Sequence, residues 1–138
     1  MKEKREYFME HHDDIRKVLL QEPRGYPCQN LNIIYFSNNP DAKFGYIILE
    51  QGAIYPLFSG HNTICVATGL LETGMIPITS ETMEFKLEAP GGLIGITASC
   101  SNGRVQAITM RSMPSFVGYQ NKILSHPKIN EELNVDGW

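Results

Sequence analysis

The chain has 138 residues, 42% of them hydrophobic and 20% charged, which fits one globular domain large enough to bury a core. Its net charge of −3 comes from 12 basic and 15 acidic residues, and without a basic stripe we do not expect nucleic acid as a partner. No apolar run approaches the roughly 20 residues that span a bilayer, and no signal-type segment follows the first residues. We therefore expect a cytoplasmic protein without membrane contact.

Residues 3 to 22 predict one helix that ends at Pro23. Ile15, Val18, Leu19 and Phe8 are expected to face a core. The polar run His11-His12-Asp13-Asp14 lies on this helix. Adjacent histidines point about 100° apart on a helix and cannot grip one metal ion together, so we assign these four residues no function.

Strands are expected at residues 31–36 and 44–50, which are rich in β-branched and aromatic side chains. After a central helix, a short strand is expected at 82–87. Residues 93–100 and 104–111 should pair as a hairpin across Ser101-Asn102-Gly103, because Asn-Gly in a short loop is a strong hairpin signal. Pro114 to Gly118 should end the sheet, and 121–138 show no clear periodicity.

The central segment opens on Ser59, closes at Gly74 and carries no charge from Gly60 to Leu71. Apolar side chains surround most of its circumference, which predicts a helix buried on nearly all sides. The free amides and positive dipole end at its start would suit an anionic group. The expected fold is α+β, a mostly antiparallel sheet rolled around a buried central helix, with residues 1–138 forming a single domain.

Four stretches together resemble the N-terminal half of the proline racemase family, which includes hydroxyproline epimerases and trans-3-hydroxyproline dehydratases. They are Glu22-Pro23-Arg24-Gly25, Ser59-Gly60-His61-Asn62-Thr63-Ile64 with its Leu71-Glu72-Thr73-Gly74 ending, Leu87-Glu88-Ala89-Pro90-Gly91-Gly92, and Pro114-Ser115-Phe116-Val117. The resemblance implies a half of a diaminopimelate epimerase-like fold. It also implies a cofactor-independent racemase, epimerase or dehydratase that acts at Cα of proline or hydroxyproline by two-base proton transfer, with no metal.

In that family, each half supplies one acid/base residue at the start of its central helix. The resemblance assigns this catalytic role to Ser59, and it assigns the substrate carboxylate to the backbone amides of Gly60, His61 and Asn62. The family's enzymes are more than twice as long, so this chain is expected to be the N-terminal lobe of a two-lobed enzyme, truncated at both ends. On its own it would be inactive, because the second acid/base residue lies in the other lobe.

Serine at position 59 replaces the usual cysteine of the family. A thiol has a pKa near ~8.5 and can supply a thiolate, whereas an alcohol is far less acidic. Ser59 is therefore expected to donate a proton or assist departure of a ring hydroxyl, while a thiolate of the missing lobe abstracts the α-proton. Serine also resembles the variant associated with hydroxyproline rather than proline. Epimerisation and dehydration both remain open.

Simpler interpretations compete with these roles. Ser59 could be a plain N-cap, although capping and catalysis are compatible. Cys65, inside the apolar helix, is expected to be a buried and inert thiol. All three cysteines, Cys28, Cys65 and Cys100, are expected to be free, because they are odd in number and far apart.

A different function class is a catalytically inactive module derived from the same lobe. It would keep the anion site, bind a small molecule and self-associate through the apolar surface that normally faces its sister lobe.

Overall fold

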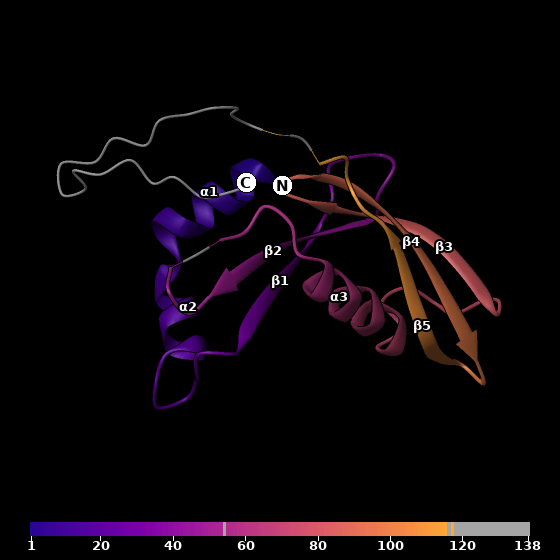
Figure 1. Ribbon diagram of the computed structural model, residues 1–138, viewed down its shortest axis with the longest axis horizontal. Coiled ribbons are helices and arrows are strands. Elements are labelled where there is room, and N and C mark those ends of the chain that lie inside the picture. The colour runs from indigo at the N-terminus through magenta and orange to yellow at the C-terminus, as the bar shows by residue number, and fades with distance from the viewer. Residues whose placement is uncertain (54, 116, 118–138) are drawn as a thin grey trace, which may run out of the picture.

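The computed structural model describes residues 1–53, 55–115 and 117, and Figure 1 shows one helix lying along a curled sheet. Two helices come first, a third follows two strands, and three further strands complete the order. The elements are α1 (Lys2–His11), α2 (Asp13–Leu20), β1 (Asn30–Phe36), β2 (Phe44–Glu50), α3 (Gly60–Glu72), β3 (Thr82–Ala89), β4 (Gly92–Ser101) and β5 (Arg104–Arg111). The α+β prediction is confirmed.

The sheet has five strands in the order β1-β2-β3-β4-β5. The pairs β1/β2, β3/β4 and β4/β5 are antiparallel, and β2/β3 is a short parallel pair in which Phe44 lies opposite Leu87. A parallel pair needs a crossover, and α3 lies within it, so the helix packs onto one face of the sheet. A mostly antiparallel sheet is thus confirmed.

The predicted β4–β5 hairpin is also confirmed. Ser101 pairs with Arg104, and the two residues between them, Asn102 and Gly103, have φ values of 52° and 72°. Positive φ at both central positions is what the tight Asn-Gly hairpin turn requires, because its twist matches that of the flanking strands.

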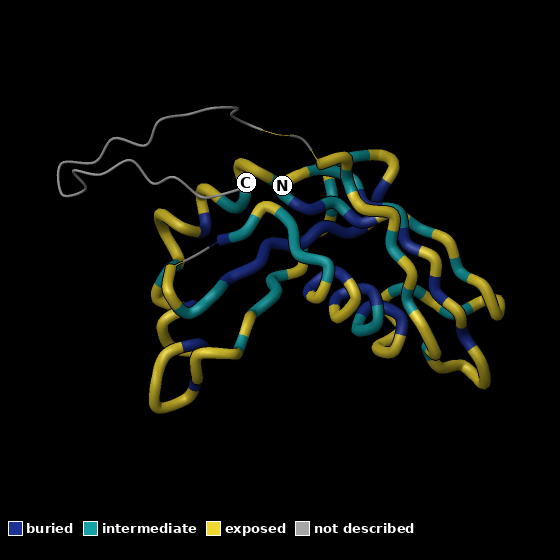
Figure 2. The backbone as a smooth tube through the Cα atoms, viewed as in Figure 1, coloured by how far each residue is buried: buried dark blue, intermediate teal, exposed yellow. Residues whose placement is uncertain are grey.

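Strand β2 is the centre of the core, buried along almost its whole length (Figure 2). Tyr46 and Ile48 pack on the α3 side with Val66 and Leu70. The alternate side chains of β2, together with Phe8, Leu20 and Tyr55, form a second cluster under α1 and α2. Both faces of β2 are covered, and its sequence is therefore a nearly continuous apolar run.

The prediction that α3 is buried on nearly all sides is wrong. Its buried side chains lie on one face, Asn62, Thr63, Val66, Ala67, Leu70 and Leu71. On the opposite face Ile64 is 41% exposed and Cys65 is exposed as well. Figure 2 shows the outward turns of α3 open to solvent, because the described sheet curls along only one side of the helix.

The single predicted N-terminal helix is two helices that break at His12, whose φ of −136° and ψ of 21° are not helical. Ile15, Val18 and Leu19 were expected in the core, but they are 38%, 52% and 40% exposed. Phe8, Arg16 and Leu20 are buried instead. The most regular apolar stripe of α2 therefore faces outward.

Arg16 holds α2 against the connection between β2 and α3. Its guanidinium donates to Asp13 Oδ1 at 2.6 Å and to the carbonyl of Gln51. Tyr55 donates to the same carboxylate oxygen at 2.6 Å, and burial, followed by the Asp13 carboxylate, raises the pKa of Tyr55 to about 12. This network fixes the chain four residues before Ser59. Within the described residues, no helix is long and apolar enough to cross a membrane.

Candidate functional site

Ser59 is the N-cap of α3, as its position before an uncharged helix predicts. Its backbone is extended, with φ −152° and ψ 125°, and its hydroxyl oxygen accepts from the amide of Asn62 at 3.4 Å. The side-chain amide of Asn62 adds a closer bond of 3.0 Å to the same oxygen. Asn62 is buried, so the cap is held from inside the protein.

Both hydrogen bonds to the Ser59 side chain end on its hydroxyl oxygen. Both recorded bonds use Oγ as an acceptor, and among the described residues no acceptor takes its own proton. Within that same part of the chain, no histidine or carboxylate is hydrogen-bonded to Oγ. The two bonds leave the O–H of Ser59 able to donate a hydrogen bond.

The first amides of α3 differ in availability. The amide of Thr63 donates to the Ser59 carbonyl at 2.9 Å, and the Asn62 amide is occupied by the cap. The described residues offer no hydrogen-bond acceptor to the amides of Gly60 and His61. The first turn carries no acidic side chain, so the positive end of the helix dipole is not neutralised. Two free amides at a helix start can hold a carboxylate.

The start of α3 is fixed to the sheet through Thr63. Its hydroxyl donates to the Ser59 carbonyl at 2.7 Å and hydrogen-bonds the phenol of Tyr46 on β2. Thr63 and Tyr46 are both fully buried, and burial raises the pKa of the Tyr46 phenol. Removing either partner of a buried hydrogen-bonded pair destabilises the folded protein. The Thr63–Tyr46 pair therefore holds the start of α3 in position.

One motif stretch contacts the segment that leads into Ser59. The amide of Gly91, in the turn between β3 and β4, donates to the carbonyl of Leu57 at 2.9 Å. A Cβ atom on Gly91 would lie 3.1 Å from that carbonyl oxygen and 2.8 Å from the Met113 methyl. The Pro90-Gly91-Gly92 turn thus packs closely on the segment that leads into Ser59. In the last motif, Phe116 lies outside the described residues.

The Glu22-Pro23-Arg24-Gly25 stretch has a structural role instead. The amide of Gly25 donates to the Gln21 carbonyl at 2.9 Å, closing the turn after α2. A Cβ atom at Gly25 would stand 2.0 Å from the carbonyl carbon of Leu20, so any larger residue would collide with backbone. The glycine is needed for close approach of two chain segments.

Cys65 is not the buried thiol that the sequence predicts. Its side chain is exposed, and its Sγ lies 3.9 Å from Nε2 of His61, one helical turn earlier. Sequence reasoning missed this pair because it placed the whole circumference of α3 in the core. The other two cysteines are free as expected, Cys28 exposed and Cys100 buried.

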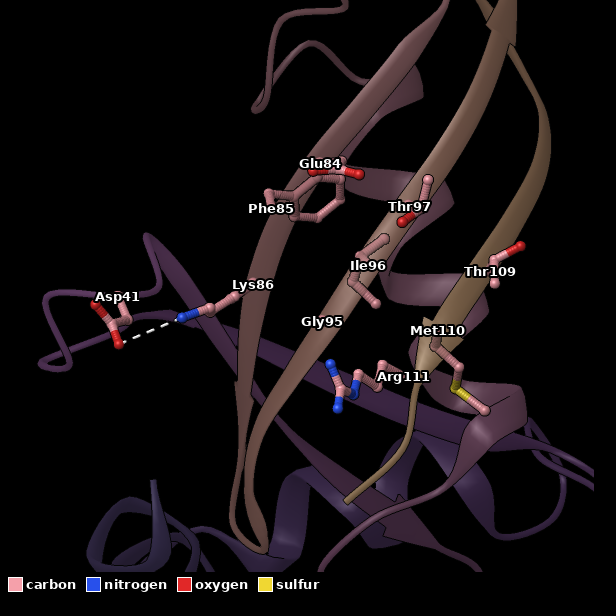
Figure 3. Close-up of a pocket in the computed structure, with 10 residues that line it drawn as sticks. All are labelled: Asp41, Glu84, Phe85, Lys86, Gly95, Ile96, Thr97, Thr109, Met110 and Arg111. Atoms are coloured by element: carbon pink, nitrogen blue, oxygen red, sulfur yellow. Dashed lines mark hydrogen bonds and ion pairs between the residues drawn. The ribbon is translucent and has the colours of Figure 1, made fainter. Parts of the chain in front are cut away.

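A cavity of about 690 Å³ lies elsewhere, on the outer side of β3, β4 and β5 (Figure 3). Lys86 at its edge pairs with Asp41 at 3.4 Å. It is lined by Asp41, Glu84, Phe85, Lys86, Gly95, Ile96, Thr97, Thr109, Met110 and Arg111. None of the residues at the start of α3 lines it. We place the candidate site at the helix start, where the cap, free amides and motifs coincide.

No group of three or more His, Cys, Asp or Glu side chains within residues 1–53, 55–115 and 117 could hold a metal ion. The sequence of this chain matches the proline racemase family over residues 1–136. The match covers nearly all of its length, and the chain belongs to that family.

Two solved structures share its fold and are 31% and 30% identical to it in sequence. A probable proline racemase from Agrobacterium radiobacter, with bound carbonate, superposes with a TM-score of 0.76 at 31% identity, over 88% of this chain and 36% of the other. A hydroxyproline epimerase from Agrobacterium vitis, with bound trans-4-hydroxy-L-proline, gives a TM-score of 0.74 at 30% identity, over 87% of this chain and 36% of the other. Both are matched in their N-terminal half.

A methylitaconate-delta-isomerase superposes with a TM-score of 0.59 at 17% identity, over 70% of this chain and 50% of the other, which supports the fold alone. The curated relatives show the same partial overlap. The chain is 38% identical to a protein from Chromohalobacter salexigens, spanning 95% of this chain but 36% of that relative. It therefore corresponds to about a third of the length of the proteins it matches, and the family and its solved neighbours are isomerases.

Proposed function

We propose that this chain supplies one of the two acid/base residues of a cofactor-independent racemase, epimerase or dehydratase acting at Cα of proline or hydroxyproline. Ser59 is the residue, and it delivers a proton to Cα or assists departure of a ring hydroxyl. The observation that carries the proposal is the hydroxyl of Ser59, which accepts two hydrogen bonds from Asn62 and keeps its own proton free of any described acceptor.

The substrate carboxylate would bind beside Ser59. The amides of Gly60 and His61 have no described acceptor, and the helix dipole favours a negative charge there. The amide of Asn62 would join them only if the long 3.4 Å cap bond gave way. A carboxylate held by these amides brings the adjacent Cα of an amino acid within reach of the Ser59 hydroxyl.

The second acid/base residue would come from outside these 138 residues. The chain spans about 36% of the length of its relatives, which supports a role as the N-terminal lobe of a two-lobed enzyme. A thiolate across the substrate would remove the α-proton, since an alcohol is too weak an acid to form the base at neutral pH. We expect this enzyme in the cytoplasm.

Solvent-deuterium exchange tests the two-base scheme. The 138-residue chain alone, incubated with proline or trans-4-hydroxy-L-proline in deuterium oxide, should exchange no Cα proton. Brisk exchange by the chain alone would contradict the proposal. In a longer protein that joins this chain to a second lobe, an inverted Cα would identify an epimerase and a pyrroline product a dehydratase.

Ser59→Ala and Ser59→Asn in that longer protein separate chemistry from capping. Asparagine is as good an N-cap as serine, so Ser59→Asn should fold normally and still lose turnover. If either variant kept both activities, the assignment of Ser59 would fail.

Exposed apolar side chains favour a second candidate, a non-catalytic binding module that self-associates. Ile64 on α3 and Phe36 on the edge strand β1 are 41% and 70% exposed. Contiguous groups of exposed apolar residues mark interaction surfaces, and this candidate requires Ile64 to belong to such a surface. Light scattering should then report a dimer or larger species that Ile64→Ser weakens. A clean monomer at high concentration, or the absence of calorimetric heat with any cyclic amino acid, would count against this module.

A further inference from the structure

Asn32 is a polar residue on the α3 side of β1. Its neighbours Leu31 and Ile33 pack in the cluster under α1 and α2, so Asn32 points to the opposite face of the sheet. Phe36, on the same face as Asn32, stacks on Phe44 of the α3-side core. The Oδ1 atom of Asn32 is buried and has no hydrogen-bond partner among the described residues. A buried acceptor without a partner destabilises a folded protein, so its presence calls for an explanation.

The strand register relates Asn32 to the start of α3. Tyr46 on β2 lies opposite Ile34 of β1, and its phenol hydrogen-bonds Thr63 in the first turn of α3. Asn32 lies two residues from Ile34, which is about 7 Å along a strand. Ser59 lies four residues before Thr63, which is about one helical pitch of ~5.4 Å. The two displacements from the Tyr46–Thr63 bond are therefore similar in length.

The two displacements also run in the same direction. Strands β2 and β3 are parallel, and the amide of Gly91, just after β3, donates to the carbonyl of Leu57, just before α3. Leu71, in the last turn of α3, packs with side chains from the opposite ends of β3 and β4. The start of α3 therefore faces the direction in which β2 runs, and Figure 1 shows β2 continuing beyond it. Asn32 thus lies on the wall that extends in front of Ser59.

A neutral hydroxyl group is the ligand that suits this amide. Oδ1 accepts a hydrogen bond and Nδ2 donates one, and a hydroxyl can do both in return. Asn32 is half-buried, so rotation of its amide can turn either atom toward a ligand. A hydroxyl costs less to remove from water than an ammonium does, which suits an uncharged amide opposite the fully buried Ile48.

We propose that Asn32 binds the ring hydroxyl of a hydroxyproline and makes the site selective for hydroxylated proline over proline itself. The proposal rests on the function proposed above, because a carboxylate held by the amides of Gly60 and His61 directs the far side of the ring toward β1. Asn32 takes no part in proton transfer. Proline would leave the amide unpaired, and a site built to hydrogen-bond a hydroxyl discriminates against the analogue that lacks it.

Titration of the ¹⁵N-labelled chain with L-proline, trans-3-hydroxy-L-proline and trans-4-hydroxy-L-proline tests the assignment. The amides of Gly60 and His61 report carboxylate binding for all three ligands. The parent chain should bind at least one hydroxyproline about tenfold or more tightly than proline. Asn32→Leu should reduce that ratio to within about twofold of one by weakening only hydroxyproline binding. Asn30→Leu is the matched control, since Asn30 is an exposed asparagine on the same face of β1, and it should keep the ratio.

Urea denaturation separates this role from a structural one. Asn32→Leu removes an unpaired buried acceptor, so it should raise the denaturation midpoint, whereas a lower midpoint would show that the asparagine holds the fold instead. Equal binding of proline and both hydroxyprolines by the parent, or a ratio that Asn32→Leu leaves unchanged, would overturn the assignment while the carboxylate site stands. If no ligand shifted Gly60 or His61, the proposed function itself would fail, and this assignment with it.

Discussion

The side-chain amide of Asn62 donates to the hydroxyl oxygen of Ser59 across 3.0 Å, and Asn62 is buried while Ser59 is half-buried. A buried residue thus holds the hydroxyl of a half-buried one. Because the bond uses Oγ as an acceptor, the O–H of Ser59 stays able to donate a hydrogen bond. Capping is therefore compatible with the proton donation proposed for Ser59.

Removal of the cap should cost stability in a predictable way. Ser59→Ala should lower the free energy of unfolding by about 1 kcal/mol, whereas Ser59→Asn should change it by only a few tenths. Urea denaturation followed by circular dichroism measures both. Equal losses for the two variants would mean that Ser59 contributes packing and no cap.

Loss of the Tyr46–Thr63 hydrogen bond should cost more stability when Thr63 is replaced than when Tyr46 is replaced. Thr63→Val leaves the buried phenol of Tyr46 without a partner and should destabilise the protein by about 1–3 kcal/mol. Tyr46→Phe removes the phenol itself, and Thr63 keeps its bond to the Ser59 carbonyl. Denaturation of both variants should rank Thr63→Val as the less stable, and the reverse order would contradict the role of this pair.

Stability should fall in acid because of Asp13. The hydrogen bond from Arg16, helped by Tyr55 and Lys17, holds the pKa of the Asp13 carboxyl far below its usual range. A lowered folded-state pKa contributes stability above the unfolded value of about 3.9, and this contribution is lost as pH falls from there. Asp13→Asn should be less stable at pH 7 and should lose less between about pH 4 and pH 2. An unchanged acid slope in urea titrations would contradict this.

Gly25→Ala should destabilise the chain by about 2 kcal/mol or more, because the new methyl group would overlap the Leu20 backbone. Gly103→Ala provides a comparison, since a Cβ there meets nothing within 4 Å and its cost comes from a φ of 72° alone. Thermal unfolding should show the larger loss at Gly25. A smaller loss of stability for Gly25→Ala than for Gly103→Ala would mean that the turn after α2 moves to accommodate the methyl group.

Much of this fold follows from local chemistry. The strands at β1 and β2, the Asn102-Gly103 turn and the Ser59 cap each depend on residues that lie close together in the sequence. These local preferences are kept in the folded protein because the tertiary contacts favour the same local structures. The α+β assignment needed only the order of these elements.

The errors share one cause, which is that apolar content does not say which face is covered. Ile64 and Cys65 are as apolar as the buried side of α3, but the described sheet packs on only that side. On α2, Ile15 and Val18 form the obvious apolar stripe, although Arg16 is the residue that enters the interior. Arg16 is buried because Asp13 and two backbone carbonyls bind its guanidinium. The two carbonyls belong to Glu50 and Gln51, which lie too far along the sequence for a periodicity argument.

Amide chemical-shift mapping by two-dimensional NMR tests the central claim most directly. Titration of the ¹⁵N-labelled chain with trans-4-hydroxy-L-proline should shift the amides of Gly60 and His61 most, because they receive the carboxylate. Prolinamide, which lacks the negative charge, should leave both unmoved. Shifts centred elsewhere, or equal shifts with prolinamide, would show that the start of α3 is not a carboxylate site and would remove the basis for placing Ser59 beside Cα.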